Sequence, residues 1–313
     1  MTDEPRVGPT PAGARRRGGE GLGAALVAVS AVLFGTVVLF AKYALRTGMP
    51  VYWLLAARFA AAALLLFAVL GLLGRPLRPE AGERMGIVFL GMVGYAVEAA
   101  FFFASLRHGT AAAMTLLFFT YPVFVTLASW AIGRGRPNGL TAASLLAAVS
   151  GGGLIVGTAG DVAARTAGIV LALMSAVTYT GYMLGAAQVV RRTNALTAAA
   201  WQAGAASIGL AILAVASGNL ESPSGWNQWW PILGMALATS GAFAFLLEGL
   251  QRIGAVRTAI VSALEPFFAA VFGTVFLAEP LGWGVAVGGL LIVAGAIAAA
   301  LARATPVTES PLP

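Results

Sequence analysis

The sequence predicts an all-α membrane protein in which ten transmembrane helices form two inverted five-helix repeats. Three observations predict this class. First, 59% of the 313 residues are hydrophobic and only 10% are charged, whereas a soluble domain carries about 25% charged residues. Second, the chain holds ten apolar stretches of membrane-spanning length. Third, the sequence repeats itself after 144 residues, which is typical of transporters built from two halves.

The main evidence for the internal repeat is that prolines of the two halves align without gaps. Pro122, in LFFTYPVFVTLASW, falls on Pro266, in SALEPFFAAVFGTVF. The same shift brings Pro137 within one residue of Pro280. Matches of Ala, Gly and Leu arise by chance in apolar sequences, so the prolines are the stronger observation.

Four segments are expected along the chain. Residues 1–20 are rich in Pro, Gly and Arg and lack hydrophobic periodicity, which predicts a disordered cytoplasmic tail. The first repeat is expected over 21–157, the second over 166–302, and a second cytoplasmic tail over 303–313. A span needs about 20 apolar residues. The expected spans, in chain order, are 23–45, 51–73, 85–106, 111–132, 139–157, 166–188, 195–217, 230–251, 257–278 and 281–302.

Basic residues in the loops predict the orientation. With the N-terminus inside, 14 basic residues lie at cytoplasmic ends and four at outer ends, with Arg58 inside a span. The outer four are Lys42, Arg46, Arg107 and Arg165. An excess on one side selects the cytoplasmic face, so both termini are expected inside. Because each repeat has an odd number of spans, the second repeat must be inverted.

Composition also limits the location and the chemistry. Of the 19 basic residues 18 are Arg, and Ala and Gly are abundant, which indicates a GC-rich bacterial genome and therefore a bacterial inner membrane. The chain has no Cys and one His, so no metal or other cofactor is expected. The net charge of +7 is assigned to loops that orient helices, and no nucleic-acid partner is expected.

Several segments resemble the EamA-type transporters of the drug/metabolite transporter superfamily. AVLFGTVVLFAKYAL resembles the family's first helix, with Phe34, Gly35 and Lys42, and LLAARFAAAALLL resembles its second, with Arg58. Tyr121–Pro122 resembles the end of the helix 4 pattern. The closest match is SALEPFFAAVFGTVFLAEPL, with Glu265–Pro266 and Glu279–Pro280. The resemblance covers residues 23–302 and implies two five-helix repeats and the export of amino acids, other metabolites or drugs. The chain departs from the family in having Gly133-Arg134-Gly135-Arg136, where members often carry an acid.

Charged residues within spans are costly and indicate function unless they are partnered. Arg58 lies roughly 10 Å and Glu98 roughly 12 Å from the outer face, so the two could pair. The pair could simply fix helix packing, or it could line a cavity, bind a zwitterion and break on protonation. Lys42 lies near an outer end. Glu248 is expected to form an ion pair with Arg252 near the inner boundary.

Two prolines interrupt symmetry-related spans. Glu265 lies about 12 Å from the cytoplasmic face, directly before Pro266, and Gln202 at nearly the same depth is its expected neutral partner. Pro122 is the mate of Pro266 in the first repeat. Each proline frees a backbone carbonyl, so each is either a static kink or a hinge. Aromatic residues complete the expected cavity, although packing is the alternative for each of them; they are Tyr95, Tyr121, Tyr179 and Trp201.

These patterns favour a secondary transporter that is not an enzyme, works by alternating access, and is a monomer or weak dimer. Its partners would be a small-molecule substrate, the lipid bilayer and a coupling proton. One alternative is an intramembrane enzyme, but Ser240 lies mid-span and His108 at the outer face of the other repeat. A passive channel, the other alternative, would need a ring of like groups, which the sequence does not show.

Overall fold

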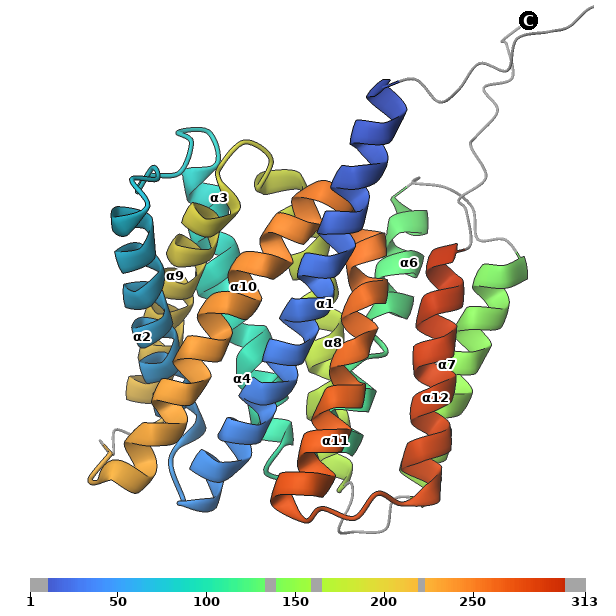
Figure 1. Ribbon diagram of the computed structural model, residues 1–313. Coiled ribbons are helices and arrows are strands. Elements are labelled where there is room, and N and C mark those ends of the chain that lie inside the picture. Colours follow the sequence, from blue (N-terminus) through green and yellow to red (C-terminus); the bar gives the residue numbers. More distant parts are fainter. Residues whose placement is uncertain (1–10, 133–138, 159–164, 219–222, 302–313) are drawn as a thin grey trace, which may run out of the picture.

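The computed structural model describes residues 11–132, 139–158, 165–218 and 223–301, and the elements in these ranges are helices (Figure 1). This confirms the all-helical class. The elements of the first half are α1 (Pro11–Arg46), α2 (Val51–Leu72), α3 (Arg84–Phe89), the π-helical turn η1 (Leu90–Tyr95), α4 (Ala96–Ser105), α5 (Ala111–Phe118), α6 (Tyr121–Ala131) and α7 (Gly139–Thr158). The second half holds α8 (Thr166–Val189), α9 (Ala195–Ala216), α10 (Trp226–Val261), the 3-10 turn η2 (Ser262–Leu264), α11 (Glu265–Leu277) and α12 (Trp283–Leu301).

Helix α1 begins at Pro11, inside the segment expected to be a disordered tail. Proline is favoured in the first turn of a helix, where its missing N–H has no partner to lose. Residues 1–10 and the C-terminal tail from 302 lie outside the described residues.

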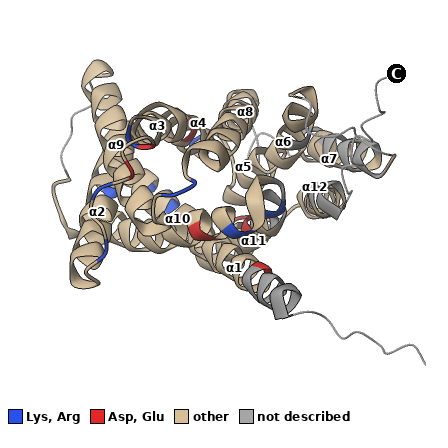
Figure 2. Cartoon of the chain, turned by 90° about the horizontal axis from the view of Figure 1, so that it is seen from above, with Lys and Arg blue, Asp and Glu red and all other residues tan. Residues whose placement is uncertain are grey.

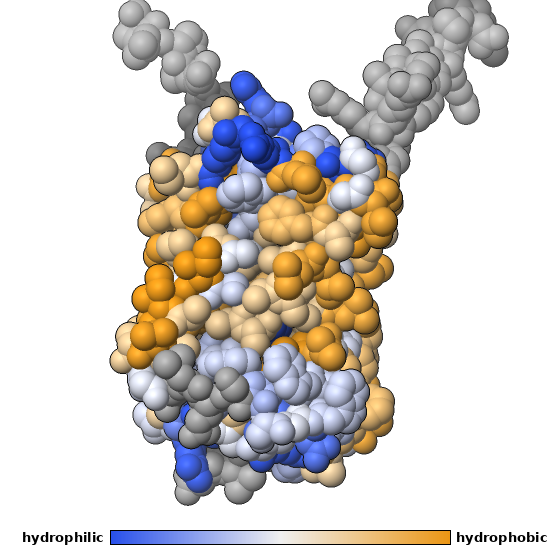
Figure 3. All heavy atoms as spheres, turned by 90° about the vertical axis from the view of Figure 1, so that its left-hand side faces the viewer, coloured by the Kyte–Doolittle hydropathy of each residue, from blue (hydrophilic) through white to orange (hydrophobic). Residues whose placement is uncertain are grey.

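Seven helical segments of the described chain are long and apolar enough to cross a bilayer, and α11 and the start of α12 are shorter apolar helices. The outer surface supports a membrane location. Figure 3 shows an apolar band between two more polar ends. Large hydrophobic side chains face outward, including Leu64, Leu237 and Leu290. Leucine side chains exposed to this degree are stable in a lipid environment, so the chain is a multi-pass membrane protein.

The helices pack in pairs that bring the two halves of the chain together. Helix α1 lies along α10, α2 along α9, and α7 along α12. Figure 2 shows α2 and α9 at one edge of the bundle and α7 and α12 at the other. The α7–α12 pair is close because of glycine: a Cβ added to Gly288 would lie 2.5 Å from the Gly151 carbonyl oxygen. Gly284 and Gly288 therefore pack within the chain, as expected for the structural use of a small-residue motif.

Three interruptions divide the long helical segments. Gly254 has φ 77°, a left-handed conformation that glycine adopts readily, and it bends α10 between two expected spans. Pro122 lies in the first turn of α6, after α5 has ended at Phe118. Pro266 lies in the first turn of α11, after the 3-10 turn η2. Each proline thus begins a new helix, where its lack of an N–H is tolerated.

Helix bounds follow the same repeat as the prolines. A shift of 144 residues carries α2 (Val51–Leu72) onto α9 (Ala195–Ala216) at both ends, and the start of α7 at Gly139 onto the start of α12 at Trp283. Sequence duplication therefore has a counterpart in the structure.

Candidate functional site

A small cavity lies in the middle of the bundle, and both halves of the chain line it. Its volume is about 30 Å³, room for two or three water molecules at roughly 10–15 Å³ each. In this conformation it is too small for a metabolite. The lining residues are Phe34, Val37, Val38, Arg58, Tyr95, Glu98, Phe102, Phe103, Phe118, Tyr179 and Glu265. We call this the central cavity.

The π-helical turn η1 positions two of the lining residues. Tyr95 is the last residue of this turn and Glu98 follows one helical turn later. Gly91 allows η1 to lie against α9, since a Cβ at Gly91 would come within 2.5 Å of the Gln202 carbonyl oxygen. Single π-turns within α-helices occur frequently at functional sites, and here the turn aims a phenol and a carboxylate at one cavity.

Arg58 is a buried cation whose hydrogen-bonding capacity is incompletely used. Arg58 is 1% exposed. Its guanidinium carbon lies 4.1 Å from the Phe59 ring centroid and 4.6 Å from the Phe103 ring centroid. These cation–π contacts stabilise the charge in part. Its Nε and Nη1 atoms have no hydrogen-bond partner in the described chain. A buried donor left without a partner costs about 1–3 kcal/mol, so Arg58 is poised to bind an acceptor.

Glu98 is held from the second half of the chain. Its Oε1 accepts a hydrogen bond from the Ser175 hydroxyl on α8 at 3.0 Å. The expected Arg58–Glu98 ion pair is not made: the two line the same cavity, but no N···O distance within 4.0 Å joins them among the residues that the structure describes. The reason is that Arg58 stacks on phenyl rings while Glu98 is drawn to Ser175. Sequence reasoning missed Ser175, because a serine in an apolar helix carries no distinguishing pattern.

Tyrosines form a buried cluster beside the carboxylates. Tyr95 contacts Tyr179 and Tyr182, with ring centroids 6.5 and 5.1 Å apart. Tyr121 lies edge-on to Tyr179, with a centroid separation of 4.7 Å. Tyr95 and Tyr179 line the central cavity, and Tyr121 stands behind Tyr179.

Three other expected cavity residues do not line the central cavity. The side chain of Trp201 donates its indole N–H to the Leu77 carbonyl at 2.8 Å. Gln202 was expected to be the partner of Glu265, and this is wrong: its Oε1 accepts from the Tyr182 hydroxyl at 2.8 Å, because α9 packs against η1 and α2. Lys42 lies one turn beyond Val38 on α1, in a separate hollow. Glu248 and Arg252 do form the expected ion pair.

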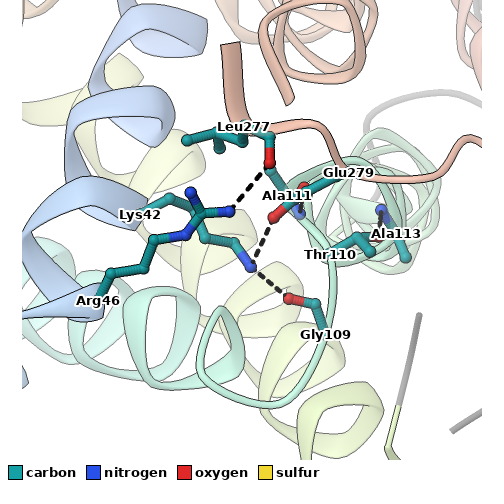
Figure 4. Close-up of polar contacts among 8 residues, drawn as sticks. All are labelled: Lys42, Arg46, Gly109, Thr110, Ala111, Ala113, Leu277 and Glu279. Atoms are coloured by element: carbon teal, nitrogen blue, oxygen red, sulfur yellow. Dashed lines mark hydrogen bonds and ion pairs between the residues drawn. The ribbon is translucent and has the colours of Figure 1, made fainter. Parts of the chain in front are cut away.

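Lys42 belongs to an ion-pair network that joins both halves of the chain (Figure 4). Its Nζ lies 3.0 Å from Glu279 Oε1 and also donates to the Gly109 carbonyl. The other oxygen of Glu279 accepts from the Ala111 N–H, at the start of α5, at 2.7 Å. The network therefore connects α1, α5 and the α11–α12 segment. Sequence reasoning treated Glu279 only as a motif residue, although it directly follows the expected span 257–278, at the same outer end as Lys42.

Neither a metal centre nor a serine–histidine pair is present in the described ranges. No group of three or more His, Asp or Glu side chains there could hold a metal ion. The Ser240 hydroxyl donates to the Ala236 carbonyl at 2.7 Å within its own helix, whereas His108 lines the hollow around Lys42. Ser240 and His108 therefore do not form a catalytic pair in the described chain.

Fold and site together define a multi-pass helical membrane protein with a charged, aromatic cavity at its centre. The model of the EamA-like transporter family matches residues 21–157 and again 166–301. The chain belongs to this family, which is part of the drug/metabolite transporter superfamily, and the resemblance found in the sequence is confirmed.

Two comparisons with individual proteins agree. The chain is 27% identical over 235 residues to the uncharacterized transporter YcbK of Bacillus subtilis (strain 168), which covers 69% of this chain and 73% of that protein. It also resembles one solved crystal structure with a TM-score of 0.63 and 20% identity, covering 87% of this chain and 98% of the other. This second likeness concerns the fold.

Proposed function

We propose that the protein is a secondary transporter that exports amino acids or other small metabolites or drugs across the bacterial inner membrane by alternating access. The observation that carries the proposal is the central cavity, where Arg58 and Glu98 of the first half face Glu265 of the second. Sparse charged groups buried at mid-bundle, between two repeats, are characteristic of a transporter's substrate site.

An inverted arrangement of two five-helix repeats is supported by the helix contacts. If the halves are exchanged, each major contact has a counterpart. The contact of α1 with α10 corresponds to that of α8 with α4 and η1, and the contact of α1 with α11 corresponds to that of α8 with α5 and α6. The α2–α9 and α7–α12 pairs are their own counterparts. Helix α1 ends, and α8 begins, beside the same hollow, lined by Arg46 and Arg165, so the two run in opposite directions.

The charge balance of the central cavity suggests what it would bind. Arg58 can balance one of the two carboxylates, Glu98 and Glu265. The other would be neutralised by a proton or by a cationic group of the solute, because uncompensated buried charges are costly. A zwitterion or a cation exchanged for protons fits this arrangement.

Alternating access requires the two halves to exchange conformations. The interruptions at Pro122 and Pro266 are related by the repeat. The first separates α5 from α6, and the second separates the end of α10 from α11. Phe118 and Glu265, beside these two interruptions, line the central cavity. We propose that both act as hinges. The closed cavity of about 30 Å³ must enlarge to admit a solute, and bending at these two positions is the simplest way to open one end at a time.

The experiment has two stages. Purified protein is first screened for solutes that raise its thermal stability, since a ligand that binds the native state does so. Stabilising solutes are then tested for counterflow in proteoliposomes, with Arg58→Gln as the inactive variant and Arg75→Gln, in an exposed loop, as the matched control. Saturable counterflow in the wild type and the control, lost in Arg58→Gln, is the expected result. Flux without saturation or counterflow would replace the carrier with a channel.

A further inference from the structure

A second, larger hollow lies at the end of the bundle where α1 ends. Its volume is about 500 Å³, enough for a small organic solute by comparison with typical ligand pockets of about 300–1,000 Å³. It is lined by Lys42, Arg46, Leu106, Arg107, His108, Gly109, Thr110, Arg165, Leu277, Ala278, Glu279 and Pro280. We call this the basic hollow.

Cations are concentrated in the basic hollow. The sequence places four basic residues at this end of the spans, and all four line this one hollow: Lys42, Arg46, Arg107 and Arg165. They face one lining carboxylate, that of Glu279. The basic residues expected at this end are thus collected at a single concave surface from three different segments, namely α1, the loop after α4 and the residue before α8, which is unlike the scattered distribution of charges that merely orient helices.

Most of the donors in the basic hollow remain available. Arg46 and Arg107 each use one terminal nitrogen, to the Leu277 and Met49 carbonyls, both at 3.0 Å. Within the described chain Arg165 interacts through its backbone N–H, with the His108 carbonyl at 2.9 Å, and its side chain makes no hydrogen bond. A guanidinium carries five N–H donors in a fork that matches a carboxylate or phosphate, so an anion could be held by several at once.

The lone carboxylate already shows how an anion is held there. Glu279 touches Lys42 at 3.0 Å and the Ala111 N–H at 2.7 Å. It follows Ala278, the one non-glycine residue with positive φ, 52°, in the described part of the chain. Such backbone strain persists where the surrounding structure requires it, often at ligand sites. Glu279 therefore acts as a tethered anion that neutralises Lys42, and it is the only carboxylate among the described residues that line the hollow.

We propose that the basic hollow binds the carboxylate or phosphate group of a small solute through Arg46, Arg107 and Arg165. On this basis, and resting on the proposed transport function, the transported solutes include zwitterions whose carboxylate or phosphate group is captured or released at this end of the central pathway.

The test uses the full chain in lipid-free detergent at constant ionic strength. Succinate, citrate and inorganic phosphate are added in turn, with neutral succinamide as the matched control, and thermal unfolding is followed. At least one anion should raise the unfolding temperature in a saturable way while succinamide does not. Arg107→Gln/Arg165→Gln should weaken that binding by about tenfold or more, whereas Arg75→Gln/Arg78→Gln, in the exposed loop after α2, should leave it unchanged.

Further variants and lipid compositions separate this proposal from its alternatives. Arg165→Gln alone removes a side chain without hydrogen bonds, so it folds normally and should still weaken binding. Arg58→Gln should abolish transport but retain anion binding, which separates this proposal from the transport function. Nanodiscs of phosphatidylcholine with or without phosphatidylglycerol separate a soluble anion from a lipid headgroup. Stabilisation by phosphatidylglycerol alone, by no soluble anion, or unchanged in the double arginine variant would overturn the proposal.

Discussion

The central cavity and the basic hollow are both lined by α1 and α11, but their charged side chains are paired differently. In the central cavity Arg58 is 1% exposed and two of its nitrogens lack partners in the described chain. In the basic hollow Lys42 and Glu279, whose side chains are each 12% exposed, form an ion pair. Burying an unpaired charge destabilises a protein, while a paired charge near water contributes modestly to stability. The comparison supports our proposal that the central cavity binds a solute, and the ion-pair network in the basic hollow stabilises the fold.

The strongest test of this contrast is Arg58→Leu. Transport should be lost completely, because the cation that binds or balances the solute is gone. Thermal stability should stay the same or rise by about 1–3 kcal/mol equivalent, since an unsatisfied buried donor is removed. Parallel transport and unfolding measurements check this. A large loss of stability would assign Arg58 to packing and remove the contrast.

Removing the Lys42–Glu279 ion pair in the basic hollow should mainly lower the stability of the fold. Lys42→Ala and Glu279→Ala should each destabilise by about 1–3 kcal/mol, because each leaves a partly buried partner unpaired. Glu279→Ala should cause the larger loss of stability of the two, since the Ala111 N–H also loses its acceptor. The double variant should lose less than the sum. Additive losses in unfolding experiments would mean that the pair is not coupled.

The prolines test whether the central cavity must open. Pro122→Ala and Pro266→Ala should each reduce transport several-fold, because alanine can extend the helix and stiffen the break. Solute binding and thermal stability should be retained or improved, because the alanine N–H can restore a backbone hydrogen bond. Transport assays at matched expression check this, and wild-type rates in both variants would show that the interruptions are fixed scaffolding.

The smallest expected effect concerns Glu83, which lies at the end of the bundle opposite the basic hollow. Partial burial works to raise the pKa of this carboxyl, but hydrogen bonds from Thr193, Arg192 and Arg191 outweigh it and hold the pKa below its ordinary value. A lowered folded-state pKa contributes stability that is present above the unfolded value of about 4.3 and lost as the pH falls below it.

Glu83→Gln should therefore lower the unfolding temperature slightly at pH 7, and the difference from the wild type should shrink as the pH falls from about 5 to 3. Salt should weaken the effect, because Glu83 is only partly buried. Unfolding temperatures measured across this range check the prediction. A difference that does not change with pH would mean that the carboxylate charge is unimportant there.

Much of the fold was predictable because apolar length and the 144-residue repeat act along the chain. The expected span 51–73 became α2 (Val51–Leu72), and both prolines begin helices as their chemistry requires. The hydrophobic lengths also predicted separate spans at 230–251 and 257–278, and the chain passes from the first to the second through the bend at Gly254 without a loop. A single glycine with positive φ can thus replace a whole loop.

Contacts between helices were harder to predict, because they depend on how each helix is rotated. Depth estimates placed Arg58 and Glu98 correctly beside one cavity but could not foresee that phenyl rings and Ser175 would separate them. For the same reason Gln202 was assigned to Glu265, whereas the rotation of α9 turns it toward Tyr182. The Lys42–Glu279 pair joins residues 237 positions apart that the repeat does not relate, so no local pattern indicated it.

Single cysteines in this naturally Cys-free chain test the central claim most directly. Val38 lines the central cavity and is 1% exposed, so Val38→Cys should react only when the cavity opens. In oriented vesicles a membrane-impermeant maleimide should label it from either side. Thr47→Cys should be labelled only from outside and Ala81→Cys only from inside. Labelling of Val38→Cys from one side alone, or from neither, would contradict alternating access through the central cavity.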